Sequence, residues 1–121
     1  MMGLKLTCQA WGADEIFSDY GFNGQKGYEH SNFGGLFPED LSTIFPWNSF
    51  YGSSMETFLA TAEYVSGSYG LETRYPYLDK EVVQEFLSLH QDLKNSAYKS
   101  VLDHYLKLNN FPFQKGFKTG F

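Results

Sequence analysis

The alternation of apolar and polar residues near the start of the chain predicts a short β-strand. Residues 4–8 read Leu, Lys, Leu, Thr, Cys, so an extended backbone would turn apolar and polar side chains to opposite faces. Gly12 and Ala13 then permit a tight turn. Asp14 and Glu15 suit the first turn of a helix, because acidic side chains oppose the positive end of the helix dipole. We therefore expect strand, turn and helix in succession, with the helix reaching about residue 20.

Apolar residues at helical spacing predict three longer helices in the second half of the chain. The first begins at Ser53 or Ser54, and Glu56 falls where it would complete a capping box with Ser53. Asp79 caps the second, and the third begins at residue 95 or 96. The side chains expected to be buried are Met55, Phe58, Leu59, Ala62 and either Val65 or Tyr69 in the first, Val82, Val83, Phe86, Leu87 and Leu89 in the second, and Tyr98, Val101, Leu102, Tyr105 and Leu106 in the third.

The remaining segments are predicted to be loops and turns. Residues 21–37 are rich in glycine and form a long ordered loop, which we expect to be pinned by its aromatic residues, Phe22, Tyr28, Phe33 and Phe37. A helical turn follows between residues 38 and 46. The prediction is thus one strand and four or five helices. One strand cannot form a sheet, so either the parallel sheet that it implies lies in a partner segment or the strand prediction is wrong.

Composition narrows the classes of partner. The net charge is −5, and a nucleic-acid-binding protein usually carries a basic excess that neutralises phosphates, so we expect no nucleic acid. Cys8 is the only cysteine, and no apolar run approaches the ~20 residues of a membrane span, so we expect a cytoplasmic protein with no membrane partner. Aromatic residues make up 19% of the chain, which predicts either an aromatic-rich core or rings on a surface that missing sequence covers.

The first segment that could carry chemistry is Gly12–Glu15. A small-residue turn between strand and helix lets backbone N–H groups approach a phosphate. The carboxylate of Asp14 beside that turn could hold Mg²⁺, which prefers oxygen ligands and bridges phosphates. A helix start with two favourable acids is the alternative interpretation.

Two further segments carry charged side chains that could take part in binding or catalysis. Glu72 and Arg74 lie two positions apart in an extended segment and face the same side, so they either line one pocket or form a surface ion pair. Lys115 and Lys118 lie in the glycine-rich end of the chain, where they could close over a polyphosphate and stabilise developing charge. A frayed, solvated terminus is the alternative there.

Taken together and in this order, the three segments resemble the asparagine synthetase family. Its synthetase domain carries an S-G-E-G-A-D-E-type motif, a G-x-E-x-R-x-P-F-L-D segment and a lysine-glycine-aromatic stretch of the K-x-G-F type. In this chain the corresponding residues are Gln9-Ala10-Trp11-Gly12-Ala13-Asp14-Glu15, Gly70 to Asp79, and Lys118-Thr119-Gly120-Phe121. The resemblance covers nearly the whole chain, and its middle motif is long and quite specific.

The resemblance implies a fold and a reaction. Residues 1–121 would be the C-terminal portion of an α/β, adenine-nucleotide-hydrolase-like (ATP pyrophosphatase) synthetase domain, and the chain itself would be mainly α with one short N-terminal strand. Family members use ATP and Mg²⁺ to adenylate a small-molecule carboxylate, releasing pyrophosphate. Ammonia or an amine then attacks the acyl-adenylate, as in asparagine biosynthesis.

The same resemblance implies roles for individual residues. Asp14 would help to place Mg²⁺ and pyrophosphate, and Lys118 would stabilise charge during adenylation, with Lys115 as the alternative lysine. Glu72 is a further candidate for substrate contact. The remaining residues of the ATP-binding turn would be Ala10, Trp11, Gly12, Ala13 and Glu15.

The chain also departs from the family pattern. Gln9, Ala10 and Trp11 stand where the family has Ser-Gly-Glu, and Trp11 cannot replace a carboxylate linked to the acyl-adenylate. The S-G-G-x-D-S pyrophosphate loop and the glutaminase domain of the family have no counterpart in this sequence. We therefore expect no catalysis by the chain alone, and a need for a missing N-terminal half, a glutaminase subunit or a homo-oligomer. A non-catalytic binding or assembly module derived from the family, or an unrelated helical domain, are the alternatives.

Overall fold

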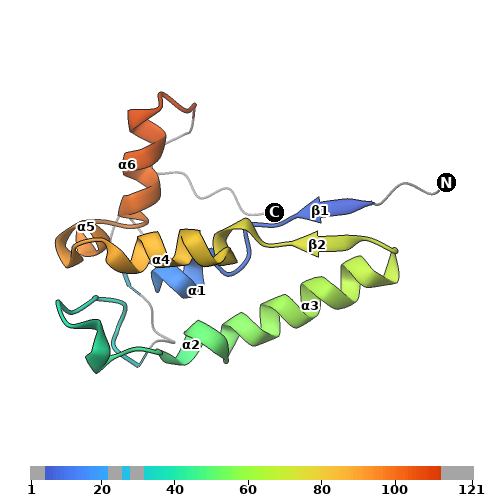
Figure 1. Cartoon of the computed structure of the whole chain (residues 1–121), viewed down its shortest axis with the longest axis horizontal. Coiled ribbons are helices and arrows are strands. Elements are labelled where there is room, and N and C mark those ends of the chain that lie inside the picture. The colour runs from blue at the N-terminus through green and yellow to red at the C-terminus, as the bar shows by residue number, and fades with distance from the viewer. Residues whose placement is uncertain (1–4, 22–25, 28–31, 113–121) are drawn as a thin grey trace.

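The structure, a computed structural model, describes residues 5–21, 26–27 and 32–112. These residues form a mainly helical small domain with one short two-stranded parallel sheet (Figure 1). The strands are β1 (Leu6–Cys8) and β2 (Glu72–Arg74). The α-helices are α1 (Ala13–Phe17), α2 (Asn48–Tyr51), α3 (Ser54–Ser68), α4 (Lys80–Ser88), α5 (Gln91–Asn95) and α6 (Ser100–Leu108), and the 3₁₀ turns are η1 (Leu41–Thr43) and η2 (Pro76–Leu78).

The strand expected near the N-terminus is present, and its partner lies within the chain. β1 pairs with β2 in parallel, with Leu6 opposite Glu72 and Cys8 opposite Arg74. The N–H of Gln9 extends the ladder by donating to the carbonyl of Arg74 at 3.0 Å. The expectation that the sheet would require a partner segment is therefore wrong. It failed because β2 reads Glu, Thr, Arg, which shows no alternation of apolar and polar residues.

α3 provides the long crossover that a parallel pair of strands requires. Figure 1 shows it running alongside the two strands, and it packs against β2. Its buried residues are Met55, Ala62 and Ser66, a stripe that leaves out Val65 and Tyr69. Both of these side chains are exposed, so the prediction that one of them is buried is wrong. Val65 lies one residue, or about 100°, around the helix from Ser66, and Tyr69 lies beyond the last residue of α3.

The start of α3 is confirmed, but the predicted capping box does not form. Ser53 has φ 54° and ψ −125°, which differs from the extended conformation of most N-cap residues. Among the described residues its side chain makes no cap hydrogen bond. Asp79, in contrast, caps α4 as predicted, because its carboxylate accepts the N–H of Glu81 at 2.9 Å.

Two helices end earlier or begin later than predicted, and in each case a left-handed residue is the reason. α1 ends at Phe17 instead of near residue 20, because Ser18 has φ 49°. The predicted last helix begins at Ser100 and not at residue 95 or 96, because Lys99 has φ 47° and cannot continue a right-handed helix. The short helix α5 before it was not predicted. Phe58, Val82 and Tyr105, which the helical pattern assigned to buried faces, are exposed.

An aromatic core holds the helices together. The ring of Phe37 lies edge-on to Trp47 and Phe86, at centroid distances of 5.3 and 5.5 Å. Trp47 is buried, and its indole N–H donates to the carbonyl of Glu15 at 2.9 Å, which ties the core to α1. Each such ring pair adds roughly 0.5–1.5 kcal/mol beyond the burial of its surface. The aromatic-rich core is therefore present, although other rings, Tyr51, Tyr64 and Tyr69, are exposed.

The glycine-rich segment and the following turn agree with the sequence pattern where they are described. Phe33 and Phe37 pack in the core as expected, whereas Phe22 and Tyr28 lie outside the described residues. The turn predicted between residues 38 and 46 contains η1. Within residues 5–21, 26–27 and 32–112, no helix combines the length and apolar character needed to cross a membrane.

Candidate functional site

A pocket of about 440 Å³ opens where the chain leaves β1. The residues that line it are Ala10, Trp11, Gly12, Ala13, Asp14, Glu15, Tyr20, Phe58, Tyr77, Lys99 and Leu102. The stretch predicted to bind the cofactor and the metal, Ala10 to Glu15, thus lies along one pocket. The pocket follows the carboxyl end of a parallel strand, which is where open α/β sheets bind ligands.

Gly12 shapes the turn that leads into α1. Its φ of 90° lies in the left-handed region, which glycine adopts at little cost. A Cβ atom at this position would lie 2.5 Å from Cδ2 of Leu78, so the packing of η2 against the turn also requires glycine. The predicted tight turn is confirmed.

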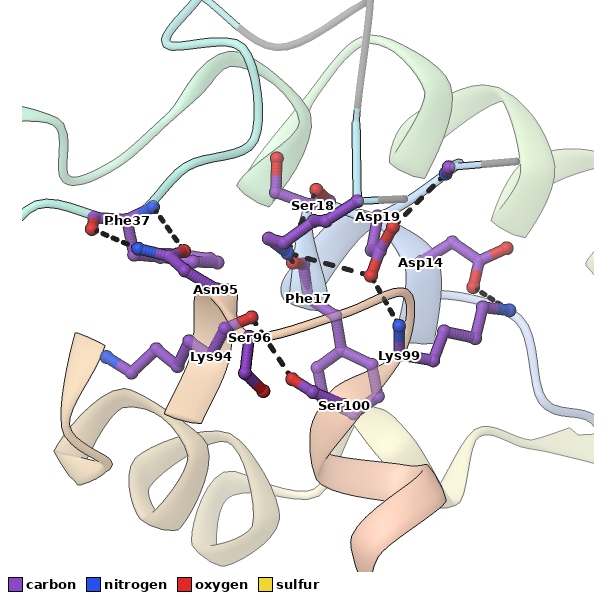
Figure 2. Close-up of polar contacts among 12 residues, drawn as sticks. Asp14, Phe17, Ser18, Asp19, Phe37, Lys94, Asn95, Ser96, Lys99 and Ser100 are labelled. Atoms are coloured by element: carbon purple, nitrogen blue, oxygen red, sulfur yellow. Dashed lines mark hydrogen bonds and ion pairs between the residues drawn. The ribbon is translucent and has the colours of Figure 1, made fainter. Parts of the chain in front are cut away.

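The ammonium group of Lys99 meets the carboxylate of Asp14 at this pocket. Lys99 Nζ lies 2.6 Å from Asp14 Oδ1, and each side chain is less than a third exposed. Figure 2 shows the pair, with Asp14 on α1 and Lys99 at the start of α6. Burial on its own would lower the pKa of Lys99, but the hydrogen bond and negative charge of Asp14, with a smaller effect of Tyr98, raise that pKa above its ordinary value. Lys99 is therefore held as a cation.

Sequence reasoning missed Lys99, and the sequence carries no signal that could have found it. The residue belongs to none of the three candidate segments and lies in a stretch that reads as the interior of a helix. Phe58 and Leu102, in contrast, were expected to be buried on helix faces, and both line the pocket. Tyr20 and Tyr77 complete the lining. Tyr77 belongs to the Gly70–Asp79 segment of the family resemblance, although no role was predicted for it, and no pattern marked Tyr20.

Glu15 is buried beside the same pocket, with 1% of its surface exposed. The hydroxyl of Tyr20 donates to its Oε1. Its backbone carbonyl accepts the indole N–H of Trp47. These contacts fasten α1 to the core, and the binding of ATP by Glu15 stays a prediction.

Trp11 and Phe58 form an aromatic wall of the pocket. Their rings are nearly perpendicular, with centroids 5.5 Å apart, and both side chains are partly exposed. This wall can pack against a flat or apolar part of a ligand. It cannot accept a proton or bind a cation as a carboxylate would, so the position occupied by Trp11 offers binding surface rather than acid–base chemistry.

Glu72 and Arg74 form an ion pair on one side of β2, as expected for positions two apart in a strand. The Arg74 side chain is mostly exposed, and neither residue belongs to the described lining of the pocket. A surface pair of this kind contributes roughly 0–1 kcal/mol. The geometry therefore favours the surface-pair interpretation, and contact of Glu72 with a substrate stays a prediction. Lys115 and Lys118 lie outside the described residues.

The described part of the chain contains no group of three or more His, Cys, Asp or Glu side chains that could hold a metal. Asp14 is the carboxylate at the pocket whose oxygen already faces a cation. A single carboxylate is compatible with Mg²⁺ only where phosphate and water supply the remaining ligands. The role of Asp14 in placing Mg²⁺ stays a prediction.

Comparisons with protein-family models, curated proteins and solved structures find no match to this chain. The resemblance to asparagine synthetases accordingly depends on the three sequence segments alone, and the chemistry of the pocket has to be inferred from its own residues.

Proposed function

We propose that the pocket binds the phosphate groups of ATP or pyrophosphate together with Mg²⁺, as part of an asparagine synthetase-like, ATP-dependent amide-forming ligase. The observation that carries the proposal is the pairing of Asp14 with Lys99 at one pocket, 2.6 Å apart, since Asp14 belongs to the segment that resembles the family's nucleotide motif. The chain would supply the C-terminal part of the synthetase domain, and an N-terminal half would supply the missing pyrophosphate loop.

The charges of the pocket suit a Mg²⁺–phosphate ligand better than a bare anion. The described lining contains two carboxyl groups, Asp14 and Glu15, and one ammonium group, that of Lys99. A phosphate oxygen can take the place of Asp14 as the partner of Lys99 Nζ, and the released carboxylate of Asp14 can then face the metal. Mg²⁺, when bound, would neutralise phosphate charge. A volume of about 440 Å³ lies within the ~300–1,000 Å³ of small-molecule pockets.

Titration calorimetry with Mg²⁺ and pyrophosphate tests this assignment. We expect the parent chain to bind pyrophosphate only when Mg²⁺ is present. Lys99→Met and Asp14→Asn should each weaken the binding roughly tenfold or more, because each leaves a charge of the complex without its partner. Lys107→Met and Asp103→Asn are matched controls, since these residues also form an ion pair but lie on α6 away from the described lining of the pocket.

Two outcomes of that titration would contradict the proposal. One is the absence of any binding of Mg²⁺–pyrophosphate or Mg²⁺–ATP by the folded parent chain. The other is an equal loss of affinity in the Asp14 and Asp103 variants, since that result would place the anion elsewhere on the surface.

A non-catalytic binding module is the second candidate, and Trp11 is the observation that favours it. The wall formed by Trp11 and Phe58 occupies the position where the family pattern has the carboxylate linked to the acyl-adenylate. Under this alternative, the pocket binds a nucleotide without catalysing a reaction, and the aromatic wall packs against the base or the sugar. Trp11→Ala should therefore weaken the binding of ATP more than the binding of pyrophosphate. Tyr64→Ala is the matched control, since that ring is exposed and outside the described lining.

Exchange of pyrophosphate into ATP separates the two candidates. We expect no exchange by the purified chain alone. The ligase proposal requires exchange to appear when a synthetase N-terminal half carrying the S-G-G-x-D-S loop is added together with a carboxylate substrate. Binding without exchange under those conditions supports the module.

A further inference from the structure

Lys99 is held in a backbone conformation that needs an explanation. It precedes α6 with φ 47° and ψ 38°, in the left-handed region that residues other than glycine seldom adopt. Within the described residues, its side chain makes no cap hydrogen bond to the helix that follows. Another contact must therefore stabilise this conformation.

That contact comes from Asp19, 80 positions earlier in the chain. The N–H of Lys99 donates to Asp19 Oδ2 at 2.6 Å, a short distance of the kind expected for a charged acceptor. Asp19 is 1% exposed. Its Oδ1 accepts the N–H of Gly21 at 3.1 Å, and Lys26 Nζ lies 3.8 Å from Oδ2. Both oxygens have partners, so the carboxylate cannot rotate without losing one of them.

Asp14 and Asp19 reach Lys99 from the same short stretch of chain. The N–H of Asp19 donates to the carbonyl of Asp14 at 3.0 Å, which joins the two residues at the end of α1. Figure 2 shows the result: Asp19 holds the backbone of Lys99, while Asp14 meets its ammonium group. The two ends of one lysine are thus fixed by one segment.

We propose that Asp19 is a positioning residue for the pocket, which holds the backbone of Lys99 so that Nζ stands where it can meet the anionic group of a ligand. Asp19 does not belong to the described lining of the pocket, so any effect on binding has to pass through Lys99. The inference rests on the proposed phosphate-binding function for the identity of the ligand. The placement of Lys99 can be tested without a ligand.

The first test measures Lys99 in the free parent chain by NMR. A short hydrogen bond to a carboxylate should shift the Lys99 amide proton far downfield and slow its exchange with solvent. A random-coil chemical shift and fast exchange of this proton in the folded chain would overturn the proposal, regardless of the affinities measured for the variants.

The second test compares Asp19→Asn in two backgrounds by calorimetry with Mg²⁺–pyrophosphate. In the parent background we expect roughly tenfold weaker binding, because a charge-assisted bond is replaced by a neutral one. In the Lys99→Met background we expect no further loss. A merely structural role would weaken binding equally in both backgrounds, and that result would refute positioning through Lys99.

A third variant covers the case in which Asp19→Asn does not fold, because it leaves the buried ammonium of Lys26 without its carboxylate. Asp19→Asn combined with Lys26→Met removes both charges and keeps the volumes similar. It should fold and show the same loss of pyrophosphate affinity, and unchanged affinity would count against the proposal. Asp79→Asn is the matched control, since it alters another carboxylate that accepts a backbone N–H, outside the described lining of the pocket.

The NMR measurement also separates this proposal from the proposed function. In one outcome the parent binds no Mg²⁺–pyrophosphate, but Asp19→Asn still speeds the exchange of the Lys99 amide proton and lowers the raised pKa of Lys99. That result supports the positioning role of Asp19 and contradicts the proposed ligand. In the other outcome the parent binds Mg²⁺–pyrophosphate, but Asp19→Asn changes neither the exchange of the Lys99 amide proton nor the affinity. That result contradicts the positioning role of Asp19 and supports the proposed ligand.

Discussion

At the scale of single residues, Lys94 and Lys99 show how the fold sets the charge of one residue type in opposite ways. Lys94 Nζ donates to the carbonyl of Leu87 at 2.9 Å and lies 5.2 Å from the ring centroid of Phe37, and the residue is buried. Burial lowers the pKa of Lys94. The pKa of Lys99 is raised despite its burial, because Asp14 stabilises the charged form. The presence of a carboxylate next to the ammonium group therefore decides whether the pKa of a buried lysine is raised or lowered.

This contrast predicts a difference in the pH dependence of stability. The folded pKa of Lys94 lies below the ordinary value of 10.5, so as pH rises toward 10.5 the unfolded chain binds more protons at this site than the folded chain. The contribution of Lys94 to the unfolding free energy should therefore rise with pH in that window. The contribution of Lys99 should stay flat there and fall only at higher pH, since its folded pKa is raised.

Urea unfolding at several alkaline pH values checks this expectation. The difference in unfolding free energy between the parent and Lys94→Met should become more favourable to the parent as pH rises, while the difference from Lys99→Met should not change. A flat Lys94 difference would show that its ammonium is better solvated than its contacts indicate.

Gly12→Ala should destabilise the chain for two reasons that a second glycine can separate. At Gly12 both the positive φ and the approach of Leu78 oppose a Cβ, so we expect a loss of roughly 1–3 kcal/mol in urea unfolding. Gly34 also has a positive φ, 69°, but nothing lies within 4 Å of the Cβ position. Gly34→Ala should therefore cost less, and equal costs would mean that Leu78 moves aside freely.

At the scale of secondary structure elements, the two helix starts that the sequence marked with capping residues behave differently. Asp79 accepts a backbone N–H at the start of α4, so Asp79→Ala should cost about 1 kcal/mol of unfolding free energy. Ser53 makes no such bond within the described residues, so Ser53→Ala should cost close to nothing. Denaturant unfolding of the two variants side by side tests the contrast, and a larger loss from Ser53→Ala would contradict it.

The elements that the sequence predicted are those defined by local patterns. α3 and α4 follow their apolar spacing, and β1 follows its alternation, because each pattern is contained in a few neighbouring residues. β2 was missed as a strand since its three residues carry no apolar face, and its pairing with β1 is a long-range contact. The late start of α6 depends on Lys99, whose left-handed backbone is stabilised by Asp19 from far along the chain. A local pattern cannot report a contact of that range.

At the scale of the whole molecule, the same division applies to the candidate site. The stretch from Ala10 to Glu15 is continuous, so its place along one pocket follows once β1 and α1 are known. Lys99 reaches the pocket only because α6 returns to the end of α1. The cation of the site therefore depends on the complete fold, whereas its carboxylate can be chosen from sequence.

The exposed apolar residues of α3 lead to a prediction about association. Val65 lies in the last turn of α3 and Tyr69 directly follows the helix, and both are exposed although the apolar pattern assigned one of them to a buried face. We expect this surface to be covered by a second copy of the chain, so the chain should self-associate. Analytical ultracentrifugation should show a species larger than the monomer, and Val65→Ser with Tyr69→Ser should reduce it. A concentration-independent monomer in both proteins would contradict this expectation.

The environments of the two tryptophans have a practical consequence. Trp47 is 1% exposed and lies in the aromatic core, whereas Trp11 is 37% exposed and lines the pocket. Indole emission depends on the polarity around the ring, so Trp47 should emit at short wavelength and Trp11 at longer wavelength. Unfolding would then be followed through the first signal and occupancy of the pocket through the second. The chain therefore carries a separate intrinsic optical reporter for each property, without any added label.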